Sequence, residues 1–125
     1  MKLEEIPQFD LILLGIGTEG HTASLFPGSP ALRERKRLVV ANWVEKLKTD
    51  RSTFTYPLLN HAACVMFLVS GEEKAEILRN IVEEPSLGLP AQGVHPAAGK
   101  LLWMVDRAAA SKLSNASNFA KVKGL

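Results

Sequence analysis

The sequence is poor in cysteine and in net charge. Its one cysteine, Cys64, lies in an apolar stretch, and a lone cysteine cannot form an intrachain disulfide. We expect it to be a small buried side chain in a protein of the reducing cytoplasm. The net charge is only +2, and no basic run is interleaved with aromatic residues, so we expect no nucleic-acid partner.

Long apolar runs and metal-ligand spacings are also missing. No apolar segment is long enough to cross a bilayer, and Met1–Glu5 lacks the apolar core of a signal peptide, so we expect no membrane association. No set of His, Cys, Asp and Glu has the spacing of a metal site. Ser24 does not lie in a GxSxG nucleophile elbow, and we read His61 and His95 as structural or surface residues.

What is present indicates one modest α/β domain over residues 1–125. Apolar runs of strand length alternate with helical patterns, and residues 72–84 show the clearest apolar stripe. We expect Trp43 and Trp103 to pack in the core and Ser114–Leu125 to fray. The expected strands are 9–14, 38–44, 51–56, 64–69 and 101–105, and the expected helices are 31–35, 58–63, 72–84 and 106–113.

The most informative stretch follows the first expected strand. The run Leu11–Leu14 is continuously apolar, as in a strand buried on both faces of a parallel sheet, and Gly15, Gly17 and Gly20 come directly after it. Glycines let a backbone turn sharply and approach a ligand, and loops at the carboxyl ends of such strands bind ligands. Glu19 and His21 in this loop are therefore candidates for chemistry.

Two other interpretations of the loop remain open. The run Gly15–Gly20 fits the dinucleotide pattern GxGxxG, but Pro27, Gly28 and Pro30 interrupt the long helix that this pattern requires. The loop is also consistent with a tight turn that carries an incidental histidine, because histidine is often structural.

Two cations are candidates for binding an anion. Lys74 lies in the first turn of the helix expected over 72–84, where a phosphate would satisfy both the free amides and the ammonium group. Arg51 begins an expected strand, and its guanidinium can hold phosphate through two bonds. The alternatives are a solvated lysine beside Glu72 and Glu73, and an arginine at a surface strand end.

Four segments resemble the 6-phosphogluconolactonase family. The loop sequence Gly15-Ile-Gly17-Thr-Glu-Gly20-His21-Thr-Ala-Ser24-Leu-Phe-Pro27 resembles the family's G-M-G-P-D-G-H-T-A-S-L-F-P. Residues 51–60 resemble R-V/I-T-L-T-x-P-x-L/I-N, and residues 69–75 resemble V-T-G-x-x-K-A. The closing segment 89–110 resembles L-P-A-x-x-V-x-P, followed by G-x-L-x-W-x-x-D-x-A-A-A.

The resemblance implies an enzyme that hydrolyses 6-phosphoglucono-δ-lactone in the pentose phosphate pathway without a metal or organic cofactor. It implies His21 as the general base that activates water, and Lys74 and Arg51 as phosphate ligands. We add that loop N–H groups near Gly17 and Gly20 could hold the developing oxyanion. The implied fold is part of a doubly wound, mostly parallel, three-layer α/β/α sheet.

Several features depart from the family pattern. Glu19 replaces the usual Asp, so its orientation of His21 is an expectation, and Thr18, Ser52 and His61 also differ. The chain resembles only the C-terminal half of the longer family members. We therefore expect association with a missing N-terminal half, or self-association through a sheet edge left open. The alternative functions are a glucosamine-6-phosphate deaminase-like enzyme and a non-catalytic sugar-phosphate-binding module.

Overall fold

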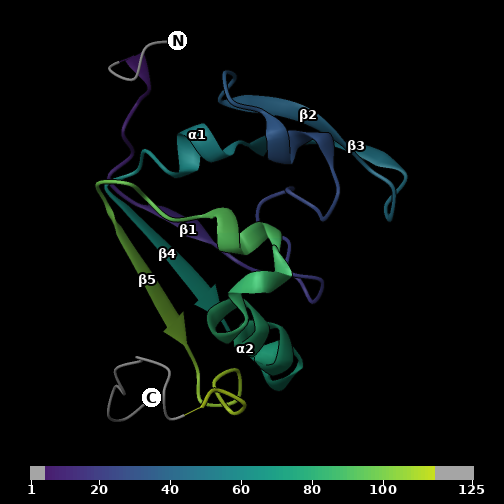
Figure 1. Ribbon diagram of the computed structural model, residues 1–125, viewed down its shortest axis with the longest axis vertical. Coiled ribbons are helices and arrows are strands. Elements are labelled where there is room, and N and C mark those ends of the chain that lie inside the picture. The colour runs from purple at the N-terminus through teal and green to yellow at the C-terminus, as the bar shows by residue number, and fades with distance from the viewer. Residues whose placement is uncertain (1–4, 115–125) are drawn as a thin grey trace.

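A three-stranded parallel sheet forms the centre of the protein. The structure is a computed structural model that describes residues 5–114. Strands β1 (Ile12–Leu14), β4 (Cys64–Val69) and β5 (Lys100–Val105) lie in the order β1-β4-β5, and both pairings are parallel. Figure 1 shows the three strands side by side. The α/β class with a parallel sheet is therefore confirmed, and β4 has the bounds expected from the sequence.

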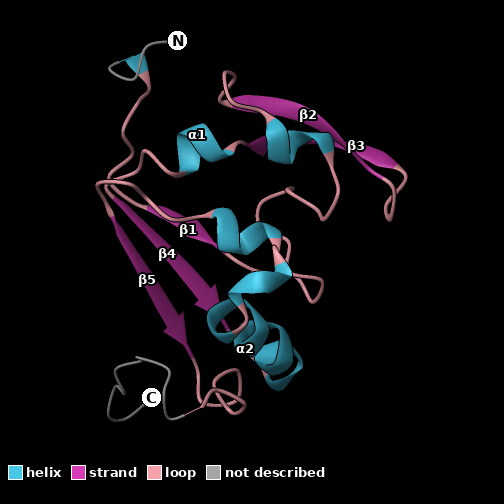
Figure 2. Ribbon diagram, in the orientation of Figure 1, coloured by secondary structure: helices cyan, strands magenta, loops and turns pink. Residues whose placement is uncertain are grey.

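The other two strands form a separate antiparallel hairpin. Strands β2 (Val39–Val44) and β3 (Thr49–Phe54) pair along their whole length and are joined by the turn at 45–48. Figure 2 shows this hairpin apart from the parallel sheet. We expected 45–50 to be only a charged connection, and the alternating burial of β2 is what indicates a hairpin with one face packed inward.

The helices are shorter than expected. Helix α2 (Ala75–Glu83) follows a 3₁₀ turn at Glu72–Lys74, and α1 (Tyr56–Leu59) has a single turn. Further 3₁₀ turns cover Pro30–Arg33, Pro85–Leu87 and Pro90–Gly93. Prolines begin all three of these turns, and Gly88 follows the second with a left-handed φ of +62°, a conformation that ends a helical segment.

The helix expected over 106–113 is wrong. This segment is a series of turns, although the Asp106 carboxylate does accept the backbone N–H of Ala109 at 2.8 Å, as an N-cap would. The same carboxylate also accepts the Ser70 hydroxyl at 2.7 Å and the Gly71 N–H at 3.2 Å. Asp106 therefore connects the end of β5 to the end of β4. Residues 115–125 of the tail expected to fray lie outside the described residues.

The core lies between one face of the parallel sheet and α2. The stripe expected on α2 is confirmed, because Ala75, Ile77, Leu78 and Ile81 are buried and Val82 packs against the same cluster. Trp103 is half-buried and stacks on Phe67 with ring centroids 4.2 Å apart. Trp43, in contrast, is 49% exposed, so its expected core position is wrong, and Cys64 is half-buried rather than buried.

The opposite face of the sheet is apolar and exposed. Strand register aligns Leu13, Met66 and Leu102 across the three strands, and Leu68 with Met104 across two of them. Of these, Leu13, Leu68, Leu102 and Met104 are 43–54% exposed. We call Leu13, Met66, Leu68, Leu102 and Met104 the outer sheet face. Parallel sheets are normally covered on both faces, and within residues 5–114 this sheet is covered on one.

Candidate functional site

The glycine loop is a compact turn that leaves the carboxyl end of β1. The N–H of Gly17 donates to the His21 carbonyl at 2.9 Å, and the N–H of Gly20 donates to the Gly17 carbonyl at 3.0 Å. The buried hydroxyl of Thr22 donates to the Gly15 carbonyl at 2.8 Å. Gly20 has φ of +86°, a conformation that favours glycine. The loop's own bonds thus fix where residues 19 and 21 lie.

The His21 ring is held on three sides. Its Nδ1 contacts Oε1 of Glu19, and its ring stacks on Phe26 with centroids 4.2 Å apart. The third side is Gly17, where an added Cβ would lie 1.9 Å from His21 Cε1. A side chain at position 17 and the observed ring therefore cannot coexist, which explains the glycine at this position.

Glu19 is ionised in this arrangement. Burial of its carboxyl group raises the pKa, but a backbone hydrogen bond and the charges of His21 and Lys46 outweigh that effect. The net result is a pKa below the ordinary value for glutamate. A carboxylate can only accept hydrogen bonds, so a neutral His21 paired with it carries its proton on Nδ1 and leaves Nε2 as an acceptor.

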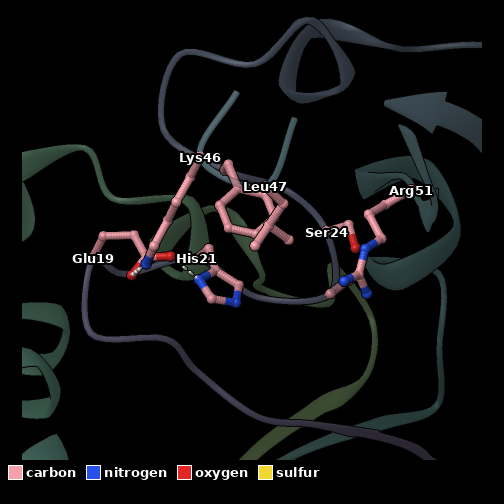
Figure 3. Close-up of a pocket in the computed structure, with 8 residues that line it drawn as sticks. Glu19, His21, Ser24, Lys46, Leu47 and Arg51 are labelled. Atoms are coloured by element: carbon pink, nitrogen blue, oxygen red, sulfur yellow. Dashed lines mark hydrogen bonds and ion pairs between the residues drawn. The ribbon is translucent and has the colours of Figure 1, made fainter. Parts of the chain in front are cut away.

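The hairpin brings positive charge to the loop. Two of its buried side chains bind Ser24: the Asn42 amide donates to the Ser24 carbonyl at 2.7 Å, and the Ser24 N–H donates to the Thr53 hydroxyl at 3.0 Å. These bonds attach β2 and β3 to the segment that follows His21. Arg51 on β3 and Lys46 in the hairpin turn consequently face the same space as His21 (Figure 3).

A pocket of about 200 Å³ results between the loop and the hairpin. In Figure 3, Lys46 extends toward Glu19 and His21, whereas Arg51 lies beside Ser24 on the other side of the histidine. Such a pocket combines a carboxylate–imidazole pair with two cations, which suits an anionic substrate that reacts by proton transfer. Its lining residues are Glu19, His21, Ala23, Ser24, Phe26, Lys46, Leu47 and Arg51.

Lys74 contacts the same loop from the 3₁₀ turn that precedes α2. Its Nζ donates to the Ile16 carbonyl at 2.5 Å, and Lys74 is not among the residues that line the pocket. The structure therefore gathers Glu19, His21 and Arg51 around one space, with Gly17 and Gly20 shaping the loop. It places Lys74 against the start of that loop.

The sequence-based reasoning missed Phe26, Lys46 and Leu47. Phe26 belongs to the quoted loop motif but carries no chemical group that would single it out. Lys46 and Leu47 lie in the charged stretch between two β-forming runs, where a hairpin turn was recognisable. The place of that turn over the loop depends on the tertiary bonds to Ser24.

Two further observations concern metal binding and membrane-spanning helices. Within residues 5–114, no cluster of three or more His, Cys, Asp or Glu could hold a metal ion. Over the same residues, no helix has the length and apolar character needed to span a bilayer.

Comparisons with known proteins agree with the resemblance in the motifs. A family model described as glucosamine-6-phosphate isomerases/6-phosphogluconolactonase matches residues 1–103. The 6-phosphogluconolactonase of Rattus norvegicus is 46% identical over 112 residues, which are 89% of this chain and 44% of the relative. The chain thus spans less than half the length of the curated relatives it matches.

Solved structures show the same relationship. The 6-phosphogluconolactonase of Trypanosoma brucei superimposes with a TM-score of 0.76 and 31% identity, over 86% of this chain and 43% of that one. A monomeric glucosamine-6-phosphate deaminase gives 0.64 and 27%, over 82% and 47%. The chain therefore belongs to the glucosamine-6-phosphate isomerase/6-phosphogluconolactonase family.

Proposed function

We propose that this chain carries the catalytic pocket of a hydrolase that opens the ring ester of 6-phosphoglucono-δ-lactone to give 6-phosphogluconate, a step of the pentose phosphate pathway. One observation carries the proposal: an imidazole oriented by a carboxylate faces a pocket that also contains Arg51 and Lys46. The relatives' name supports the choice of a lactone as substrate.

In the proposed mechanism, His21 acts through Nε2. A water molecule attacks the lactone carbonyl carbon, and Nε2 takes a proton from that water as the carbon–oxygen bond forms. The tetrahedral intermediate then collapses, the ring carbon–oxygen bond breaks, and the proton passes from the imidazolium to the departing ring oxygen. The products are a free hydroxyl and a carboxylic acid, which loses its own proton to solvent.

Glu19 orients the ring for this reaction. Its carboxylate accepts the Nδ1 proton and stabilises the imidazolium that forms when Nε2 is protonated. Glutamate is one methylene longer than the aspartate of the family pattern, and the contact between Oε1 and Nδ1 shows that this longer side chain reaches the ring.

The substrate's phosphate is assigned to Arg51 and Lys74. Arg51 lines the pocket and offers a planar set of donors that matches phosphate oxygens. For Lys74 to bind the phosphate, its ammonium must share or leave the Ile16 carbonyl. Replacement of Lys74 by Met should raise KM if it contacts substrate, whereas loss of loop order alone should lower kcat and thermal stability together.

The backbone N–H groups of Gly17 and Gly20, like the Lys74 ammonium, already donate hydrogen bonds within the protein. Because the N–H groups of Gly17 and Gly20 donate within the loop, an oxyanion would have to share these donors. We therefore assign two roles to Gly17 and Gly20. The first is to let the substrate come close to the backbone, and the second is to share their N–H groups with the oxyanion.

We further infer that the outer sheet face associates with the rest of a family-length protein, or with a second copy of this chain. Four of its apolar side chains are roughly half exposed, and the relatives are more than twice as long as the matched region. A contiguous apolar surface of this kind is typical of an interface. A cytoplasmic location stays a prediction.

The test is a hydrolysis assay of the purified 125-residue chain, measured above the spontaneous rate of lactone opening. It is repeated with the N-terminal half of the rat relative supplied separately. Turnover in either sample that disappears in His21→Ala supports the proposal. Turnover that His21→Ala leaves intact removes His21 from the mechanism.

Two other functions have specific support. Likeness to a glucosamine-6-phosphate deaminase structure favours deamination, although the Ser24-Leu-Phe26 sequence differs from the family pattern of such enzymes, and ammonia release from glucosamine 6-phosphate would establish it. A non-catalytic sugar-phosphate-binding module is the second alternative, because Arg51 lines a pocket and its guanidinium can hold phosphate. Calorimetric binding of 6-phosphogluconate, without turnover in either assay, would establish that function.

A further inference from the structure

The turn of the β2–β3 hairpin places a lysine on the far side of the Glu19 carboxylate. Lys46 Nζ lies 3.6 Å from Oε2 of Glu19, while Oε1 of the same carboxylate contacts Nδ1 of His21. The two oxygens of one carboxylate are thus divided between a lysine and a histidine. Thr18 Oγ1 also donates to Oε2, at 3.3 Å.

The hairpin holds this lysine in register with the loop. Leu47 N–H donates to the Val44 carbonyl at 3.1 Å, and Lys48 N–H donates to the Glu45 carbonyl at 3.2 Å, which closes the turn. The strands on either side are attached to Ser24 through the buried side chains of Asn42 and Thr53. The backbone of Lys46 therefore has a defined place relative to Glu19, even though its side chain is 66% exposed.

We propose that Lys46 is a positioning residue for His21 and acts through Glu19. By holding Oε2, its ammonium keeps the carboxylate turned so that Oε1 accepts the Nδ1 proton of the ring. The ring then presents Nε2 as the acceptor, which is the state a general base requires.

The contacts around His21 give Lys46 a narrower role than attracting an anionic substrate into the pocket. The ring itself is already constrained by Phe26 and by the absence of a side chain at Gly17. What those contacts leave undetermined is which nitrogen carries the proton, because stacking and close packing do not distinguish tautomers. The orientation of the Glu19 carboxylate determines that, and Lys46 is the charged side chain that contacts its second oxygen among the described residues.

The hairpin turn supplies its own matched control. Lys48 lies two residues further on, and its ammonium is 4.0 Å from the Glu45 carboxylate rather than close to Glu19. Replacing Lys48 by Met removes the same charge from the same turn without removing the contact to Glu19. Lys46→Arg keeps a cation in place, and Lys46→Met keeps the length of the side chain without the charge.

The first measurement is the tautomer of His21 by long-range proton–nitrogen NMR of the ¹⁵N-labelled chain, about two pH units above the ordinary histidine pKa of roughly 6.5. We expect the Nδ1–H form to dominate in the unmodified chain, in Lys46→Arg and in Lys48→Met. In Lys46→Met the ratio of Nδ1–H to Nε2–H should fall about two- to fivefold, the range for an exposed ion pair. An unchanged ratio in Lys46→Met, or an equal fall in Lys48→Met, overturns the inference.

The second measurement is turnover in a catalytically competent sample. Lys46→Met should lower kcat about two- to fivefold with little change in KM, and Lys46→Arg should restore it. A rise in KM at constant kcat would instead mean that Lys46 binds substrate, and would overturn the positioning role. The inference rests on His21 being the base, as proposed above, but the tautomer is measured without turnover. Failure of the lactonase proposal and failure of this one therefore give different results.

Discussion

Replacing Gly17 by Ala is expected to displace His21 and so to abolish most catalysis while leaving the fold intact. The new methyl group would lie 1.9 Å from Cε1 and 2.0 Å from Nδ1 of the ring, far inside contact distance, so the ring must move. It would leave both its stack on Phe26 and its contact with Glu19. The φ angle of Gly17 is not in the left-handed region, so the backbone itself accepts alanine.

The magnitude follows from what is lost. General-base catalysis typically contributes 10²- to 10⁴-fold, so kcat should fall by about this range. The cost in stability should be smaller, at the low end of the about 1–3 kcal/mol typical of overpacking, because the His21 side chain is 26% exposed and can swing toward solvent. The matched control is Gly15→Ala, since an added Cβ at position 15 meets nothing within 4 Å.

Two assays test this prediction. Lactone opening above the spontaneous rate measures kcat in a competent sample, and urea unfolding measures the free energy of unfolding. The ring-proton NMR shifts of His21 report its displacement even where the chain does not turn over. A Gly17→Ala variant with full turnover and unshifted ring protons would refute the reasoning, as would a Gly15→Ala variant that loses as much activity.

Three further predictions concern stability and association. Asn42→Ala leaves the Ser24 carbonyl without its donor and should lower the free energy of unfolding by about 1–3 kcal/mol in urea titration; no change would mean that the hairpin is held otherwise. Hydrogen bonds from Ala109, Ser70 and Gly71 lower the pKa of Asp106, so its contribution is present above the unfolded pKa of about 3.9 and is lost as pH falls through the lower folded value. The free energy of unfolding of Asp106→Asn, measured by urea titration at several pH values, should therefore fall less steeply as pH drops through that range than that of the unmodified chain, and an equal slope would contradict this. Leu13→Glu on the outer sheet face should reduce self-association in light scattering and weaken binding of a separately supplied N-terminal half, whereas Leu87→Glu, at a comparably exposed position off the sheet, should change neither.

Local pattern was sufficient for the elements with strong signals. The apolar run Cys64–Val69 predicted β4 with the bounds observed, and Ser70-Gly71 marks its end. The stripe on α2 predicted which of its side chains are buried. The helix expected over 106–113 is a series of turns instead, in which the N–H groups of Ser111 and Leu113 donate to carbonyls three residues earlier.

The candidate site likewise contains residues that the sequence pattern identified and residues whose place only the fold determined. Loop residues Glu19 and His21 were identifiable because glycines, a carboxylate and an imidazole occur together directly after an apolar run, and this stretch is one of the four segments that carry the family resemblance. Arg51 was named for its charge, but its place beside His21 depends on a hairpin that folds back onto Ser24.

The order of residues alone thus predicts the glycine loop, a strand before it and, through four short segments, the family to which the chain belongs, because each of these patterns depends on neighbours within a few positions. Folding in three dimensions decides which cations face His21: it brings in Arg51 and Lys46 across the β2–β3 hairpin and turns Lys74 toward the Ile16 carbonyl. The physical reason is that charge and hydrogen bonds act through space, and the residues that meet in this pocket are up to 32 positions apart, from Glu19 to Arg51.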